Sequence, residues 1–262
     1  IVKYKVRIRG RGIEFASLSE YTPQDDAKYI DWNASARMNK PYLKVFEEER
    51  DLNIIVVLDV SNSMFFGTTE KTKLEYARIL AGAICFAGIE IGDSASICLF
   101  SNEVKKFIPP KKGEVQYFSI LKELVDKENY GGDFNLNECL GFLNRLVGKK
   151  SVIILISDFL GDLNWEEKLK STRYRFEKFL AIMLRDPRDD FIPEGVGNIK
   201  LKDPYSNEFM EVNIEKYKEE FEREVRKREE KIKEIFESCN AGFIKTYTDK
   251  PFVKPLVKYL SV

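Results

Sequence analysis

The sequence predicts an α/β protein with a doubly wound, mostly parallel sheet flanked by helices. Two unbroken apolar runs, at residues 54–58 and 152–156, have the composition of strands that are buried on both faces of a parallel sheet. Between and after these runs, segments with helical apolar spacing alternate with further strand-like segments, a pattern that is typical of βαβ units. The 262 residues suffice for one large α/β domain with appendages.

Residues 1–50 are predicted to form an N-terminal extension that packs on the core. Apolar and basic residues alternate over residues 2–9, which indicates an edge strand with one solvated face. The following segment contains four charged residues among aromatic ones: Asp25, Asp26, Asp31 and Arg37. They can form either a binding surface or a salt-bridged cap over the sheet, and we favour the cap because ion pairs commonly tie irregular segments down.

The predicted core spans residues 51–185, and its first strand ends in Asp59. Two serines, Ser61 and Ser63, follow at alternate positions. In open α/β sheets, ligands bind beyond this end of the strands. One carboxylate and two hydroxyl oxygens suit a hard cation, Mg²⁺ or Mn²⁺, better than Zn²⁺ or Cu²⁺. The alternative is a serine-rich turn in which Asp59 and Ser61 cap a helix.

A second strand end strengthens the metal hypothesis. The apolar run at residues 152–156 is followed by Ser157 and Asp158, so two buried strands would deliver carboxylates to the same edge of the sheet. Between the two strands lies the glycine-rich loop 130–135, in which Asp133 is a further oxygen donor.

The remaining elements follow from apolar spacing and turn residues. Thr72 and Glu75 have capping-box spacing and begin a helix that ends at Gly92. We expect further strands at 94–100, 179–184 and 243–247, helices at 114–125, 136–147 and 164–174, and a short apolar helix from residue 252. Residues 186–262 are predicted to add a hairpin, a long helix and a last strand to the same domain.

Two parts of this C-terminal region have specific interpretations. The run Arg185 to Asp190 is expected to be a solvated loop because five of its six residues are charged. The charged helix at 214–238 has apolar residues on one face, interrupted by Arg228. This pattern favours a helix docked on its own domain over a coiled coil that binds a partner.

Composition excludes several classes of function. Lys plus Arg and Asp plus Glu both number 43, so a general electrostatic grip on nucleic acid is not expected. The absence of histidine rules out Ser-His-Asp and Cys-His catalysis and histidine-based zinc sites. Cysteines 85, 98 and 139 lie in apolar contexts, and free buried thiols favour the cytoplasm. No segment of this chain has the apolar length of a membrane span, although the start at Ile1 leaves an upstream segment open.

The order of these motifs resembles the von Willebrand factor A domain, in which they form a metal-ion-dependent adhesion site. Residues 21–37 resemble the Tyr-x-Pro-Gly-Asp-Asp-x-Arg-x-Ile-Asp-Trp-x-x-x-Ala-Arg signature of the domain-of-unknown-function family 58, with Gln24 in place of Gly and Lys28 in place of Arg. The likeness continues at residues 44–50, 66–67, 109–113 and 157–159. It implies a von Willebrand A-like, Rossmann-like fold and an association with MoxR-type AAA+ ATPases.

The resemblance also implies a ligand set. Asp59, Ser61 and Ser63 match the residues that surround Mg²⁺, and Asp158 matches the later aspartate. Phe134 stands where the family supplies threonine, and a phenyl ring cannot ligate a cation. Asp133 would substitute if the loop shifts. Otherwise the site binds metal weakly or not at all.

These observations support a non-enzymatic protein-interaction module without catalytic residues. It would bind an acidic side chain of a MoxR-like AAA+ ATPase, or of that ATPase's client, as an adaptor in complex assembly or maturation. An alternative is a metal-assisted hydrolase or phosphatase that uses Asp59. Ser61 argues against it, because haloacid-dehalogenase-type phosphotransfer requires a second Asp there and no assisting lysine can be placed. A third possibility is a metal-free scaffold with a degenerate site.

Overall fold

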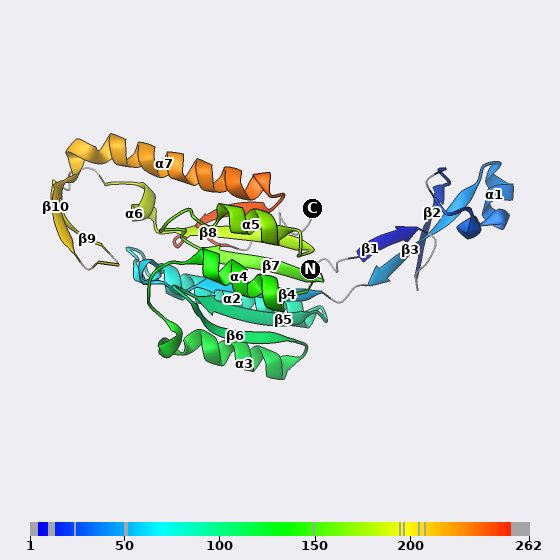
Figure 1. Cartoon of the computed structure of the whole chain (residues 1–262), viewed down its shortest axis with the longest axis horizontal. Coiled ribbons are helices and arrows are strands. Elements are labelled where there is room, and N and C mark those ends of the chain that lie inside the picture. Colours follow the sequence, from blue (N-terminus) through cyan, green and yellow to red (C-terminus); the bar gives the residue numbers. More distant parts are fainter. Residues whose placement is uncertain are drawn as a thin grey trace. The chain divides into compact units, whose positions relative to one another are not determined.

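The structure of the protein is a computed structural model (Figure 1). It describes residues 5–9, 14–23, 25–49, 52–148, 150–193, 195, 197–203, 205–206 and 208–252. The chain divides into two compact units, Ile1–Asp51 and Leu52–Val262. Packing of the first unit on the second stays a prediction.

The N-terminal unit contains a three-stranded antiparallel sheet of order β1-β3-β2. Its elements are β1 (Lys5–Arg9), β2 (Glu14–Glu20), α1 (Trp32–Met38) and β3 (Tyr42–Glu49). The predicted edge strand is confirmed over residues 5–9, and residues 2–4 lie outside the described residues. Asp31 caps α1 by accepting from the amides of Asn33 and Ala34, and it pairs with Lys44 at 3.3 Å. These contacts stabilise the start of the helix.

The second unit, the core unit, is built on a six-stranded sheet of order β11-β8-β7-β4-β5-β6. Its strands are β4 (Asn53–Asp59), β5 (Ser94–Phe100), β6 (Val104–Lys111), β7 (Ser151–Ser157), β8 (Lys178–Arg185) and β11 (Gly242–Tyr247). All neighbours are parallel except β5 and β6. The chain leaves β4 toward β5 and later returns to its other side as β7, so the strand order reverses at β4.

Helices cover both faces of this sheet (Figure 1). They are α2 (Lys73–Glu90) and α3 (Glu114–Val125) on one face, and α4 (Leu136–Leu146), α5 (Glu166–Arg173) and α7 (Ile214–Ser238) on the other. Successive residues of β4 point to opposite faces, with Val56 and Val57 in different core clusters. The predicted α/β fold is therefore confirmed.

Small residues let α2 approach the sheet closely. A Cβ atom at Gly88 would lie 2.6 Å from Cδ1 of Ile54 on β4, so only glycine fits without displacing that side chain.

Helix α2 begins with the predicted capping box, in which the Thr72 hydroxyl accepts from the Glu75 amide and the Glu75 carboxylate accepts from the Thr72 amide.

Two elements of the core unit, the strand β6 and the short helix α6 (Pro187–Asp190), were not expected from the sequence. Strand β6 was missed because it contains Pro109 and Pro110, but it is an antiparallel edge strand, where proline is tolerated. The one-turn helix α6 follows β8. The hairpin is confirmed as β9 (Asn198–Lys202) paired with β10 (Phe209–Asn213).

The long helix α7 docks on the core unit through its C-terminal half, as predicted. Ile232, Ile235 and Phe236 are buried, whereas Tyr217 near the start is 53% exposed.

The four cysteines are free and buried, which confirms the expectation for Cys85, Cys98 and Cys139. The expected apolar helix beyond residue 252 lies outside the described residues. A bilayer-spanning helix needs about 20 apolar residues, and we find none that qualifies among the helices of the described ranges.

Candidate metal and protein-interaction site

Asp59 and Asp158 meet at the edge of the sheet where the strand order reverses. Asp59 is the last residue of β4, Asp158 follows the last residue of β7, and the two strands are direct neighbours with Leu58 opposite Ile156. The carboxyl ends of parallel strands at such a switch point form a crevice in which ligands bind. The shared edge expected from the two apolar runs is therefore present.

A chain of hydrogen bonds connects these carboxylates through the two serines. The Ser61 amide donates to Oδ1 of Asp59 at 2.9 Å, and the Ser61 and Ser63 hydroxyl oxygens lie 3.3 Å apart. The Ser63 hydroxyl donates to Oδ1 of Asp158 at 3.1 Å. All four side chains are buried. The structure thus brings Asp59, Ser61, Ser63 and Asp158 together.

Ser157 is a site residue that the sequence reasoning did not identify. Its hydroxyl donates to Oδ2 of Asp59 at 2.6 Å and accepts from the Phe159 amide at 2.9 Å. Burial and, to a lesser degree, the negative charge of Asp158 together raise the pKa of Asp59 to about 7, against the hydrogen bonds from Ser157 and Ser61. The only signal for Ser157 was its place directly before Asp158 at the strand end.

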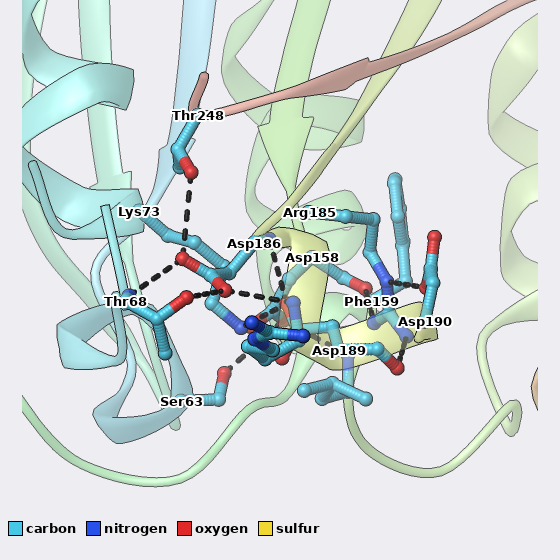
Figure 2. A network of polar contacts seen from close by, with 12 residues as sticks. Ser63, Thr68, Lys73, Asp158, Phe159, Arg185, Asp186, Asp189, Asp190 and Thr248 are labelled. Carbon is cyan, nitrogen blue, oxygen red and sulfur yellow. Dashed lines mark hydrogen bonds and ion pairs between the residues drawn. The ribbon is translucent and has the colours of Figure 1, made fainter. Parts of the chain in front are cut away.

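Lys73 is the second residue that the sequence reasoning missed. Its ammonium lies 2.7 Å from Oδ2 of Asp158 and 2.9 Å from Oδ2 of Asp189, and its side chain is completely buried (Figure 2). Burial lowers the pKa of Lys73, but the charges of Asp158 and Asp189 outweigh burial and raise it. Lys73 is the first residue of α2, so the capping motif beside it was the available signal.

Within the run from Arg185 to Asp190, the residues Arg185, Asp186 and Asp190 are buried beside this site and only Arg188 is exposed, so the prediction of a solvated loop was wrong. The Arg185 guanidinium pairs with Asp190 at 3.0 Å and donates to the Asp158 carbonyl at 3.3 Å. Asp186, which is fully buried, accepts from the hydroxyl and amide of Thr68 (Figure 2). These charges can be buried because they pair with one another and with polar groups far away in the sequence.

The loop before α4 places its residues differently. Asp133 is exposed, and within the described part of the chain it has no hydrogen bond or ion pair with the four clustered residues. Phe134 instead packs against Phe100, with ring centroids 6.0 Å apart. Two hydrogen bonds fix the backbone of Gly132 to Asn62. The backbone amide of Asn62 donates to the Gly132 carbonyl, and the side-chain oxygen of Asn62 accepts from the Gly132 amide.

Comparisons with known proteins agree with this architecture. The family model "Protein of unknown function DUF58" matches residues 17–231. The chain belongs to this family. "Uncharacterized protein Rv1480" of Mycobacterium tuberculosis is 27% identical over 257 residues, which are 97% of this chain and 80% of that protein. An uncharacterized protein of Mycobacterium avium is 24% identical over 58% of this chain and 91% of its own length.

Solved structures resemble this DUF58 protein in fold. BatB from Bacteroides thetaiotaomicron has a TM-score of 0.52 and 17% sequence identity, and the match covers 80% of this chain and 97% of BatB. The SpRpn10 VWA domain has a TM-score of 0.44 at 9% identity, covering 80% and 95% of the two chains. The likeness to BatB concerns the fold alone, and it agrees with the doubly wound sheet that carries helices on both faces.

The donor set of this DUF58 protein fits a hard divalent cation. Four oxygen-bearing side chains converge, and the buried Asp59 carboxylate has no ion-pair partner within the described ranges. Those ranges contain no group of three or more His, Cys, Asp and Glu residues arranged for a metal, so the serine hydroxyls would have to contribute. The Lys73 ammonium already balances the negative charge of Asp158. Asp59 is therefore the carboxylate whose charge a bound cation would balance.

Proposed function

We propose that this DUF58 protein is a protein-interaction module whose Asp59, Ser61, Ser63 and Asp158 bind Mg²⁺ or Mn²⁺. The ion would in turn bind an acidic side chain of a partner protein. The observation that supports this most is the buried, hydrogen-bonded convergence of these four side chains at the switch point of the sheet. Because serine hydroxyls are neutral, the bound ion would keep an excess of positive charge for an incoming carboxylate.

Each residue has a distinct part in this proposal. Asp59 supplies the main negative charge, and Ser157 and the Ser61 amide fix the orientation of its carboxylate. The two serine hydroxyls supply neutral oxygens. Asp158 is oriented by Lys73 and by the Leu160 amide, which donates to Oδ1 at 2.9 Å. Asp133 is exposed and would contribute only if its loop shifts.

The partner we propose is a MoxR-like AAA+ ATPase, or a client of one, that the module joins in complex assembly or maturation. This part rests on the family resemblance alone. We also propose a cytoplasmic location, because the buried cysteines are all free.

Calorimetric titration of the full chain with Mn²⁺ tests the metal site. We expect binding that Asp59→Asn abolishes, because a neutral amide cannot balance the charge of the ion. The matched control is Asp133→Asn, which removes a carboxylate from the neighbouring loop and should change the affinity little. Loss of binding in Asp133→Asn would assign that residue to the site, and absence of binding in the parent chain would contradict the proposal.

Lys73 is relevant to the two alternative functions, a metal-assisted hydrolase and a metal-free scaffold. An ammonium beside Asp158 supplies the assisting lysine that the sequence could not place, which favours a hydrolase. However, Ser61 still occupies the position of the second carboxylate. A phosphatase screen with Asp59→Ala as control would detect that activity. The same ammonium favours the metal-free scaffold, because it partly replaces a metal ion as counter-charge.

A further inference from the structure

Tyr205 connects the β9–β10 hairpin to the candidate site. It lies in the turn between the two strands, and its hydroxyl donates to the Leu160 carbonyl at 2.6 Å. Leu160 belongs to the loop that leaves β7, and its amide donates to the Asp158 carboxylate. In Figure 1 the hairpin lies at the end of the core unit where the parallel strands finish. A residue distant in sequence is thereby anchored beside Asp158.

The side chains of the candidate site influence the Tyr205 phenol electrostatically. Burial is the largest of the effects that raise the pKa of Tyr205 to about 12; the Ser63 and Ser61 hydroxyls oppose the rise, and the charges of Asp158 and Asp59 contribute to it. All four side chains of the candidate site therefore act on the phenol.

The site is closed to a partner in this arrangement. Relative exposure is 0% for Asp59, 0% for Ser61, 2% for Ser63 and 1% for Asp158. A cation that joins two proteins needs one coordination position that the second protein can reach. No carboxylate from outside can reach these residues unless a covering element moves.

We infer that the Tyr205 hydroxyl is an internal occupant of the site and fills the position that a partner's carboxylate must take. In the part that concerns the partner, this inference rests on the proposed function. A neutral phenol is a weaker ligand for a divalent cation than a carboxylate, so the exchange favours the partner. The hairpin therefore acts as a cover that an acidic segment displaces.

Two properties of the β9–β10 hairpin would allow it to move away from the site: glycines precede it, and it buries little apolar surface. Gly195 and Gly197, which precede β9, have φ angles of 74° and 63°, a region that glycine adopts readily. On β10, Phe209 is 59% exposed and Met210 is 64% exposed, so this strand buries little apolar surface. Segments with few buried apolar contacts open at low free-energy cost.

Thiol labelling of Ser63→Cys in the full chain tests the cover without metal. The four native cysteines are buried and supply the baseline. With Tyr205 present, we expect slow labelling by a small methanethiosulfonate reagent. Tyr205→Phe removes one hydrogen bond and should raise the rate roughly fivefold. Tyr205→Ala removes the ring as well and should raise the rate by about tenfold or more.

The matched control is Met210→Ala, which changes an exposed residue of the same hairpin and should leave the rate unchanged. Equal labelling rates with and without Tyr205→Ala would overturn the inference, as would fast labelling in the presence of Tyr205. Tyr205→Phe keeps the ring, so it decides the question if Tyr205→Ala fails to fold.

Water-proton relaxation with Mn²⁺ separates this inference from the proposed function. We expect each bound Mn²⁺ to enhance relaxation more in Tyr205→Ala than in the parent chain, because water replaces the phenol. Equal enhancement in both chains would contradict an occupant at the cation. If neither chain binds Mn²⁺, the proposed metal function fails, while the labelling result still decides whether Tyr205 covers the site.

Discussion

The ammonium of Lys73 lies 2.7 Å from the carboxylate of Asp158, and neither side chain is exposed to solvent. The same ammonium lies 2.9 Å from Asp189 in α6. The start of α2, the end of β7 and the turn after β8 are therefore joined by one charged group. The ion pairs of Lys73 at the candidate site therefore also stabilise the fold, because they link three elements of the core unit.

Replacing Lys73 by methionine should destabilise the protein strongly. Lys73→Met keeps the apolar stem but leaves Asp158 and Asp189 buried without their shared cation, which costs about 3–5 kcal/mol. Urea denaturation measures the free energy of unfolding. The control is Lys71→Met, since Lys71 is exposed and 3.9 Å from Glu70, and such a pair contributes about 0–1 kcal/mol. Equal losses in the two variants would refute the structural role of Lys73.

Divalent metal should raise the melting temperature of the chain. A ligand at 100 times its Kd stabilises the folded state by about 2.7 kcal/mol, which corresponds to roughly 5–10 °C for a protein of this size. Differential scanning calorimetry with millimolar Mg²⁺ or Mn²⁺ measures the shift, and Asp59→Ala should abolish it. An unchanged melting temperature in the parent chain would favour the metal-free scaffold.

Asp186 should make the stability sensitive to acid. Burial alone raises its pKa, but hydrogen bonds from the Thr68 hydroxyl and amide outweigh burial and hold the pKa below the usual 3.8. The folded state therefore binds fewer protons than the unfolded state in this range. The stabilisation is present above pH 3.8 and is lost as the pH falls through the lower folded-state value.

Thr68→Val tests this contribution by removing one donor from a buried carboxylate. It should cost about 1.5–3 kcal/mol at neutral pH and reduce the acid dependence of unfolding below pH 3.8. Thr22→Val, which removes a solvent-exposed hydroxyl bond to Asp25, is the control and should leave that dependence intact. An unaltered pH profile in Thr68→Val would show that Asp186 does not depend on this hydroxyl.

Gly161→Ala should disturb the loop beyond Asp158. An added Cβ would lie 2.5 Å from Cδ1 of Phe134, so the ring or the loop must shift, and overpacking of this kind costs about 1–3 kcal/mol. Arg228 donates to the carbonyls of Phe159 and Gly161, which limits how far the loop can yield. Gly148→Ala meets no atom within 4 Å and serves as control. Matching stabilities for both variants, measured by thermal unfolding, would contradict this close contact.

Local patterns predicted the elements of the core unit well. The apolar runs that became β4 and β7 contain enough β-branched residues to indicate buried strands, and the capping box at Thr72 marked the start of α2. Arg228 interrupts the apolar face of α7 because its guanidinium reaches the carbonyls after Asp158. Nothing in a helical pattern reveals such a distant acceptor.

By itself, the sequence determined that Asp59, its two serines and Asp158 stand at the ends of buried strands, because strand burial and side-chain alternation are local properties of a chain. Only the tertiary structure decided how their charges are balanced. Lys73, Asp189 and Tyr205 come from three other segments, and their contacts with the site depend on how those segments fold over the sheet. Hydrogen bonds and ion pairs between residues far apart in the chain leave no periodicity in the sequence, so these partners became identifiable only once the fold was known.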